Sequence, residues 1–230
     1  MLTFSPGKRL VAPCTCQIIT RDDANTIIDC LESALRPGIF ERILIVIDTR
    51  SEDATGRIIH AYSQAYPNVQ ICPYKWSDPP DFAAARNFGI SVSRTPYIFW
   101  LDGDEKLVQP AQIAAMLRDA QGEAFMMWII SPVAGGFHNM YQPRLFPVVP
   151  GIRFECPVFE RVDWSLKRAG VTLRMTDAQP IQHPGYMNAG TLAKKNQRNL
   201  RIMRGYLREH RQDDEPRRHI VEQYRKLTGR

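Results

Sequence analysis

The stretch Pro96-Tyr-Ile-Phe-Trp-Leu-Asp-Gly-Asp104, continued by Glu105, joins an apolar run directly to an acidic cluster. The apolar residues from Tyr97 to Leu101 predict a strand that is buried on both faces. The three carboxylates after it would repel one another at a crowded sheet edge, unless water or a hard divalent cation such as Mg²⁺ or Mn²⁺ neutralised them. The glycine between the two aspartates would let a ligand approach the backbone closely. The alternative is a solvated acidic turn.

Short apolar runs alternate with helix-like segments before that strand. The pattern predicts strands over residues 16–20, 43–47 and 69–72, and helices over residues 22–35, 54–65 and 82–92. After the strand it predicts helices over 109–120, 158–168 and 191–211, and strands over 125–131, 141–146 and 171–175. The order indicates an α/β fold with a mostly parallel central sheet, helices on both of its faces, a small antiparallel part and C-terminal helices. Ligands bind such sheets beyond the carboxyl ends of the strands, where the polar clusters 21–23, 48–53 and 102–104 fall.

Length and composition set the class of protein. The chain has 230 residues, of which 44% are hydrophobic, enough for one large domain or for a domain with an appendage. No apolar run approaches the roughly 20 residues that span a bilayer, and no signal peptide is evident. Five cysteines without a Cys-x-x-Cys pair favour reduced thiols, so we expect a cytoplasmic protein.

The basic excess of the chain lies entirely near its C-terminus. Residues 1–190 carry a net charge of −1 and residues 191–230 a net charge of +7. We therefore predict a main domain over 1–190 and a basic C-terminal helical appendage over 191–230, which points to an anionic partner. On the predicted helix, an apolar face formed by Leu192, Leu200, Met203 and Leu207 lies opposite a row of arginines, namely Arg198, Arg201, Arg204, Arg208 and Arg211. The first four arginines are candidates for binding that partner, and the alternative is a solvated helix surface.

Four motifs, in order along the chain, resemble those of family 2 glycosyltransferases with a GT-A fold, and the resemblance runs from about residue 17 to residue 214. Residues 45–55, Ile-Val-Ile-Asp-Thr-Arg-Ser-Glu-Asp-Ala-Thr, resemble the nucleotide-binding stretch of that family. Residues 81–87, Asp-Phe-Ala-Ala-Ala-Arg-Asn, resemble its Phe-Ala-x-x-Arg-Asn helix, and residues 101–105 resemble its Asp-x-Asp metal motif. Residues 181–186, Ile-Gln-His-Pro-Gly-Tyr, followed by Lys195-x-x-Arg198-Asn199, resemble a bacterial subgroup that includes lipopolysaccharide-core glucosyltransferases.

The resemblance implies transfer of a sugar from a nucleotide-diphosphate sugar, with a UDP-sugar favoured as donor. It implies that the donor is bound by Asp48, Ser51, Asp53, Arg86, Asn87 and Asp102. It also implies a Mn²⁺ or Mg²⁺ ion, acting as a Lewis acid on the departing diphosphate and held by Asp102, Asp104 and His183. The alternatives are a strand-end cap for Asp48, a helix-surface pair for Arg86 and Asn87, and a turn histidine for His183.

Inverting transfer also needs a base that takes the proton of the acceptor hydroxyl. Residues 156–162, Cys-Pro-Val-Phe-Glu-Arg-Val, resemble the Val-His-Glu segment of the family, with Phe159 where histidine is usual. The resemblance makes Glu160 the candidate base. The alternative is an acidic residue that complements a helix dipole.

Two kinds of acceptor fit these residues. The family resemblance suggests a saccharide such as a lipopolysaccharide core, and the basic tail also fits a hydroxylated base in DNA. A nucleotidyltransferase is a second function class, but it would carry a glycine-rich phosphate loop where this chain has Arg21-Asp-Asp23. A non-catalytic nucleotide- or nucleic-acid-binding module is a third, and the set of Asp102, Asp104 and Glu160 argues against it.

Overall fold

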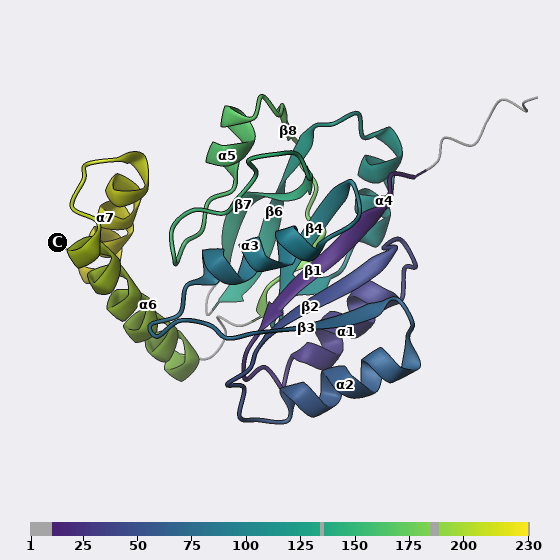
Figure 1. Cartoon of the computed structure of the whole chain (residues 1–230), viewed down its shortest axis with the longest axis horizontal. Coiled ribbons are helices and arrows are strands. Elements are labelled where there is room, and N and C mark those ends of the chain that lie inside the picture. The colour runs from purple at the N-terminus through teal and green to yellow at the C-terminus, as the bar shows by residue number, and fades with distance from the viewer. Residues whose placement is uncertain (1–10, 134–135, 185–188, 230) are drawn as a thin grey trace, which may run out of the picture.

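The computed structural model describes residues 11–133, 136–184 and 189–229 of the chain. Within them, one nine-stranded sheet has the strand order β3-β2-β1-β4-β7-β6-β9-β5, with β8 paired to β6 (Figure 1). The parallel half consists of β1 (Cys14–Thr20), β2 (Arg42–Asp48), β3 (Val69–Tyr74) and β4 (Tyr97–Asp102). These are the four strands predicted from the apolar runs, so the polar ends of β1, β2 and β4 meet at one edge of the sheet.

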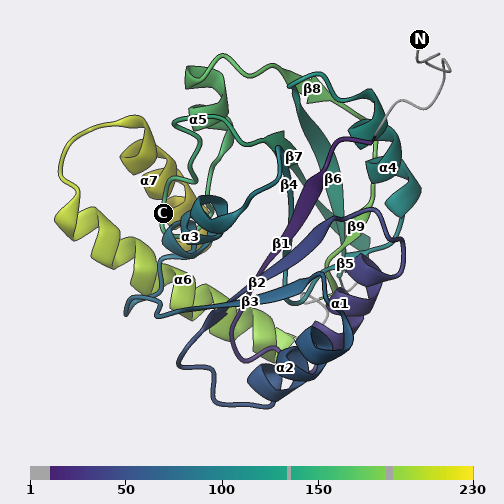
Figure 2. The ribbon, with the colours of Figure 1, turned by 45° about the vertical axis from the view of Figure 1, so that its right-hand side comes forward.

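Helices cover both faces of the parallel half (Figure 2). Ile43, Ile45 and Ile47 of β2 face one side, in a core with α1 (Ile27–Leu35), α2 (Thr55–Ala65) and α4 (Pro110–Asp119). Leu44 and Val46 face the other side, toward α3 (Phe82–Val92). Because neighbouring residues of a strand point to opposite faces, an uninterrupted apolar run is what a strand covered on both sides requires.

Two helices begin later than the sequence predicted. The first starts at Ile27 rather than at residue 22, because Asp22 has a left-handed φ of 54° and its carboxylate accepts the Glu52 N–H from the neighbouring loop (2.7 Å). The helix predicted over 158–168 is α5 (Asp163–Arg168), because Glu155 and Arg161 exchange backbone hydrogen bonds and close a loop before it. Asp22, a polar residue that suits the start of a helix, here joins two loops instead.

The antiparallel half is built on a long pair of strands, β6 (Ala124–Val133) and β7 (Gly136–Pro147), and β7 also pairs with β4. Three short strands extend it: β8 (Leu173–Met175) and β9 (Ile181–Gln182) each pair parallel with β6, and β5 (Lys106–Leu107) pairs antiparallel with β9. The strands predicted over 125–131, 141–146 and 171–175 fall within or on these elements. Gly185 and Tyr186 of the motif that follows β9 lie outside the described residues.

Two C-terminal helices, α6 (Ala189–Glu209) and α7 (Glu215–Thr228), pack side by side at one end of the molecule (Figure 1). Their buried residues Ile202, Met203 and Ile220 form an apolar cluster with residues of the segment 156–164. The division of the chain at residue 190 stays a prediction. Within the described residues no helix is long and apolar enough to cross a membrane, and all five cysteines are buried thiols.

Candidate active site

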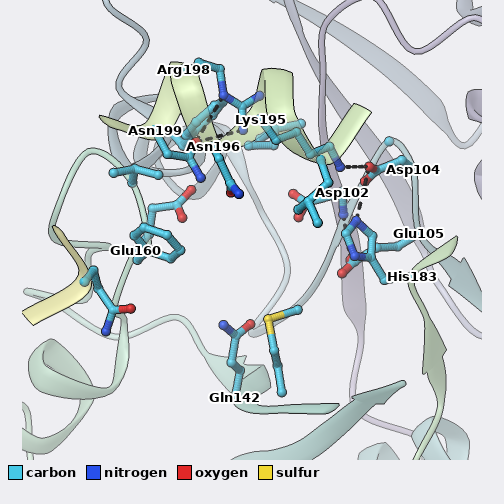
Figure 3. Close-up of a pocket in the computed structure, with 18 of the residues that line it drawn as sticks. Asp102, Asp104, Glu105, Gln142, Glu160, His183, Lys195, Asn196, Arg198 and Asn199 are labelled. Carbon is cyan, nitrogen blue, oxygen red and sulfur yellow. Dashed lines mark hydrogen bonds and ion pairs between the residues drawn. The ribbon is translucent and has the colours of Figure 1, made fainter. Parts of the chain in front are cut away.

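A pocket of about 680 Å³ opens at the carboxyl ends of β1 and β4 and is walled by β7, α6 and α7 (Figure 3). It brings together predicted site residues from five separate parts of the chain: Arg86, Asp102, Asp104, Glu160, His183 and Arg198. Figure 3 shows Glu160 on one side, Asp104 and His183 on the other, and side chains of α6 across the opening. The polar edge that the sequence predicted is therefore the floor of a cavity.

Arg86 links two of the predicted carboxylates. Its side chain is only 3% exposed, and Nη2 donates to Asp102 Oδ1 at 2.6 Å while Nε donates to Glu160 Oε1 at 3.4 Å. Burial alone would raise the pKa of Asp102, but the guanidinium of Arg86 beside it holds that pKa below its ordinary value. Burial has the larger effect on Glu160 and raises the pKa of its carboxyl group. Arg86 therefore contacts two carboxylates of different character, an ionised Asp102 and a more basic Glu160.

Asp104 lies between two nitrogen atoms. Its Oδ2 is 3.1 Å from His183 Nε2 and 2.6 Å from Lys195 Nζ of α6. Although burial opposes ionisation, these two groups hold the pKa of Asp104 well below its ordinary value. Asp104 is therefore an anion in the folded protein. The sequence motif contains Lys195, but its contact with Asp104 was not predicted.

Glu105, the third carboxylate of the cluster, fixes the turn rather than facing the cavity as a bare charge. It is 1% exposed, accepts the Asp102 N–H at 2.9 Å, and receives two hydrogen bonds from Arg144 at 2.6 and 2.8 Å. The ring of Trp100 lies against Arg144 and Arg86, whose guanidinium carbons are 3.5 and 4.0 Å from its centroid. A charged residue inside the apolar end of β7 is the one sequence signal for this arrangement.

Gly103 is required by a close contact within the protein itself. A Cβ atom at this position would lie 2.6 Å from Asp23 Oδ2 and 2.8 Å from Thr20 Oγ1. The space that the sequence assigned to an approaching ligand is thus taken by these side chains. Burial, reinforced by the nearby charge of Asp104, raises the pKa of Asp23 to about 6.

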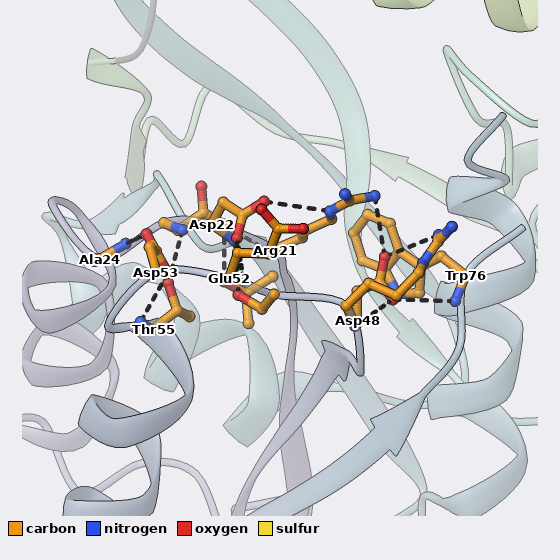
Figure 4. A network of polar contacts seen from close by, with 12 residues as sticks. Arg21, Asp22, Ala24, Asp48, Glu52, Asp53, Thr55 and Trp76 are labelled. Atoms are coloured by element: carbon orange, nitrogen blue, oxygen red, sulfur yellow. Dashed lines mark hydrogen bonds and ion pairs between the residues drawn. The ribbon is translucent and has the colours of Figure 1, made fainter. Parts of the chain in front are cut away.

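The predicted nucleotide-binding loop is held by contacts within the chain (Figure 4). Asp48 is fully buried at the end of β2, accepts the N–H groups of Arg50 (3.1 Å) and Trp76 (3.4 Å), and pairs with the Arg50 and Arg21 guanidiniums. Burial opposes its ionisation, but hydrogen bonds from Arg50 lower the pKa of Asp48. In these contacts Asp48 caps the end of the strand, which was its alternative role.

Ser51, Asp53 and Asn87 also bind neighbouring segments. The Ser51 hydroxyl accepts the Asp22 N–H (3.1 Å), and Asp53 accepts the Ala24 and Thr55 N–H groups (2.9 and 2.8 Å), which ties the loop after β1 to the loop after β2. Asn87 uses both ends of its amide on the backbone of Phe154, at 2.9 and 2.7 Å. Their contacts with a nucleotide sugar stay predictions.

The arginines of the C-terminal helix differ in what they border. Arg198 borders the pocket, with its guanidinium carbon 4.7 Å from the centroid of the Phe82 ring. Arg198 is exposed, as are Arg201, Arg204 and Arg208, and Arg201 pairs with Asp78 at 3.1 Å. Arg211 lies beyond the last residue of α6. The row of arginines thus divides into one pocket residue and an outer group of three.

Comparison with known proteins adds a family and a fold. The sequence matches glycosyl transferase family 2 over residues 15–198, whereas no curated protein matches it. S. aureus TarS 1-349 in complex with UDP-GlcNAc is similar in structure, with 13% identity, a TM-score of 0.61, and coverage of 94% of this chain and 71% of that chain. The mannosyltransferase PcManGT from Pyrobaculum calidifontis, in complex with GDP-Man and Mn²⁺, has 12% identity, a TM-score of 0.61, and coverage of 94% and 70%.

A third structure, GalNAc-T7 with UDP, GalNAc and Mn²⁺, has 11% identity, a TM-score of 0.58, and coverage of 78% of this chain and 44% of that chain. The chain also spans only 42% of a longer TarS structure. At these identities the likeness shows a shared fold. The predicted α/β fold of the GT-A type is confirmed.

Proposed function

Because this chain belongs to glycosyl transferase family 2 and is a glycosyltransferase, we propose that it is a metal-dependent inverting enzyme acting on an anionic acceptor. The donor is a nucleotide-diphosphate sugar, with a UDP-sugar favoured. The observation that supports this proposal best is the single pocket that gathers Arg86, Asp102, Asp104 and Glu160 at the carboxyl edge of the sheet. Family membership favours sugar transfer over the nucleotidyltransferase and the non-catalytic binding module.

Two side-chain atoms in the pocket are placed to act as ligands of a divalent cation. Asp104 Oδ2 and His183 Nε2 are 3.1 Å apart, a spacing that suits two adjacent ligands at bond lengths of about 2.0–2.2 Å. Among the described residues, no three His, Cys, Asp or Glu side chains gather around one point. The remaining positions would belong to diphosphate oxygens and water, as is usual for Mg²⁺, with Asp102 toward the ribose or a metal-bound water.

The bound Mn²⁺ or Mg²⁺ would act as a Lewis acid on the leaving diphosphate. Lys195 contacts the same oxygen of Asp104, so a cation competes with this ammonium group for the carboxylate. PcManGT and GalNAc-T7 are structures with Mn²⁺, which supports a divalent ion here. Arg86, Asn87, Asp48, Ser51 and Asp53 remain our candidates for holding the donor.

Glu160 is proposed as the base that takes the proton of the acceptor hydroxyl while the diphosphate leaves from the opposite face of the sugar. Its raised pKa makes it a better proton acceptor than an ordinary carboxylate, and Arg86 orients it. Phe159 supplies no imidazole where the family usually has one, so this position offers no metal or phosphate contact. The acceptor we propose is a lipopolysaccharide-core-like saccharide or a hydroxylated base in DNA, and the reaction is assigned to the cytoplasm.

Replacing Asp104 by Asn tests the proposal. The purified protein is assayed with UDP- and GDP-sugars, with Mn²⁺, Mg²⁺ or EDTA, by release of the nucleoside diphosphate. D104N should fold and lose transfer, because removal of a charged ligand takes away several kcal/mol of leaving-group stabilisation. D177N, which changes an exposed aspartate away from the pocket, is the matched control. Full activity in EDTA, or in D104N, would contradict the metal assignment.

A further inference from the structure

The loop that carries Glu160 has a strained backbone. Cys156 and Phe159 have left-handed φ values of 70° and 56°, although neither is a glycine. Such conformations persist in side chains of this size only where neighbouring structure holds them. The two backbone hydrogen bonds between Glu155 and Arg161, both 2.9 Å, close the loop at its base. In the middle of the loop the Pro157 carbonyl accepts the Phe82 N–H of α3 at 2.9 Å, and Phe159 and Glu160 follow.

The carbonyl group of Phe159 is held by α7. His219 Nε2 is 3.0 Å from the carbonyl oxygen of Phe159. A carbonyl oxygen can only accept, so the ring nitrogen donates this hydrogen bond. Burial lowers the pKa of His219, which leaves the ring neutral at neutral pH with its proton on Nε2. The ring also packs edge-on against Trp164, with centroids 5.5 Å apart, so its direction is fixed from a second side.

The same face of α7 reaches the pocket. Gln223, Lys226 and Leu227, which follow His219 by four, seven and eight residues, line the cavity. These spacings place them on one side of a helix. Ile220 anchors the helix in the apolar cluster that also contains Cys156 and Val158. Because the family match ends at residue 198, α7 lies outside the region that the family shares.

We propose that His219 is a positioning residue that sets the direction of Glu160 through the backbone of Phe159. The carbonyl of Phe159 and the N–H of Glu160 belong to one planar peptide unit, so holding the oxygen fixes the orientation of that plane. The Cα of Glu160 follows the plane, and with it the carboxylate that faces the acceptor. This inference rests on the proposed role of Glu160 as base.

Variants of His219 separate the hydrogen bond from the packing. H219F keeps an aromatic ring against Trp164 but removes the N–H group that donates to the Phe159 carbonyl. H219Q keeps an N–H group at a similar distance from the backbone. H219F should lower kcat by about 10-fold to 10²-fold, the cost of a base displaced by up to about 1 Å. The affinity for the nucleotide sugar, measured by calorimetry, and the melting temperature should stay close to those of the unmodified protein, and H219Q should recover most of kcat.

H210L, which changes an exposed histidine of the loop after α6, is the matched control. If H219F does not melt cooperatively, the smaller H219L replaces it in the same comparison.

The double variant H219F/E160Q connects the effect to Glu160. If His219 acts through that carboxylate, the double variant should turn over no more slowly than E160Q alone. The inference would be overturned if the loss of kcat in the double variant equalled the product of the two single losses. An H219Q variant as slow as H219F would also overturn it. Unchanged kcat in H219F beside a slow E160Q would overturn this inference only. Unchanged kcat in E160Q would instead overturn the assignment of the base.

Discussion

At the scale of single residues, the carboxylates of the pocket differ because burial and neighbouring charge act on each in a different balance. Asp102 and Asp104 each have cations within 2.6 Å, and their pKa values lie below the ordinary value. Glu160 has Arg86 at the longer distance of 3.4 Å, and burial raises its pKa. The first two suit roles as permanent anions, and the third suits proton transfer.

Replacing Glu160 by Gln should lower turnover by about 10²–10⁴-fold, the usual contribution of a general base. Donor affinity should be retained, because the base contacts the acceptor. In the unmodified enzyme a base must be ionised to work, so activity should fall as the pH drops through a value above the ordinary 4.5 of Glu. The pH profile of kcat/KM measures this. Lost donor affinity in E160Q would place Glu160 in the nucleotide pocket, and an unchanged rate would move the role to Glu155 or Asp163.

Asp23 should make the stability of the protein depend on pH. Its pKa rises from 3.8 to about 6 on folding, so the stability that the protonated side chain contributes is complete below pH 3.8 and is lost as the pH rises through 6. At 1.4 kcal/mol per pH unit the ionised side chain costs about 3 kcal/mol. D23N should therefore raise the free energy of unfolding by up to about 3 kcal/mol at pH 8 and change it little near pH 4. Urea unfolding in EDTA, without donor, measures the difference.

Asp53 is the control, because its effect on stability should depend on pH in the opposite direction to that of Asp23. Burial opposes its ionisation, but hydrogen bonds from Thr55 and Ala24 lower its pKa in the folded protein. Its contribution is present above the ordinary pKa of Asp and is lost as the pH falls. D53N should therefore cost stability at neutral pH and lose this effect at low pH. Equal slopes for D23N and D53N would contradict both assignments.

At the scale of elements, the position of α3 on β1 sets the position of Arg86. A Cβ atom on Gly89 would lie 2.1 Å from Gln17 Nε2, and the same nitrogen donates to the Arg86 carbonyl at 2.7 Å. Gln17 is fully buried, and moving its amide away would break the hydrogen bond to Arg86. The contact between helix and strand therefore needs a glycine, and through Arg86 it reaches Asp102 and Glu160.

Replacing Gly89 by Ala should lower the free energy of unfolding by about 1–3 kcal/mol, because a methyl group is forced into a filled core. Alanine favours a helix over glycine by about 0.5–1 kcal/mol, which offsets only part of this cost. Gly56 in α2 is the matched control, because its added Cβ would meet only Ile47 Cδ1 at an ordinary 3.8 Å. G56A should be stabilising by that helix preference. Urea unfolding of both variants decides the point, and equal effects would show that the Gly89 contact relaxes freely.

At the scale of the whole molecule, positive charge is concentrated in the two C-terminal helices beside an acidic pocket. Arg201, Arg204 and Arg208 are exposed along α6, where a polyanion could bind them and release counterions. Arg198 is separate from this group, since it borders the pocket. An extended anionic acceptor could therefore contact the outer arginines while its hydroxyl reaches Glu160.

If DNA is the acceptor, the triple variant R201E/R204E/R208E should abolish binding to duplex DNA without changing nucleotide-sugar affinity. Binding by the unmodified protein should fall steeply between about 50 and 200 mM salt, as expected for several phosphate contacts. A second triple variant, R36E/R57E/R118E, makes the same change in net charge at exposed positions away from α6. Salt-insensitive binding, or equal losses in both variants, would exclude this use of the helix. Retained transfer to a lipopolysaccharide core would show that the outer arginines are a solvated face.

The sequence by itself determined the parallel half of the sheet, its covered faces and the acidic edge. Apolar runs, helical spacing and aspartates at strand ends are local patterns, and parallel pairing brings those ends together without further information. The same local motifs were enough to predict the family and its fold. They also predicted that Arg86, Asp102, Asp104 and Glu160 gather in one site.

Only the tertiary structure decided which charged or polar group contacts which. Arg144 with Glu105, His219 with Phe159 and Lys195 with Asp104 are pairs separated by 39, 60 and 91 residues. It also decided that Asp22 binds a neighbouring loop instead of starting a helix, and that Arg198 borders the pocket instead of joining the outer arginines. Such contacts leave no periodic mark in the chain, because they depend on where whole helices and strands come to rest against one another.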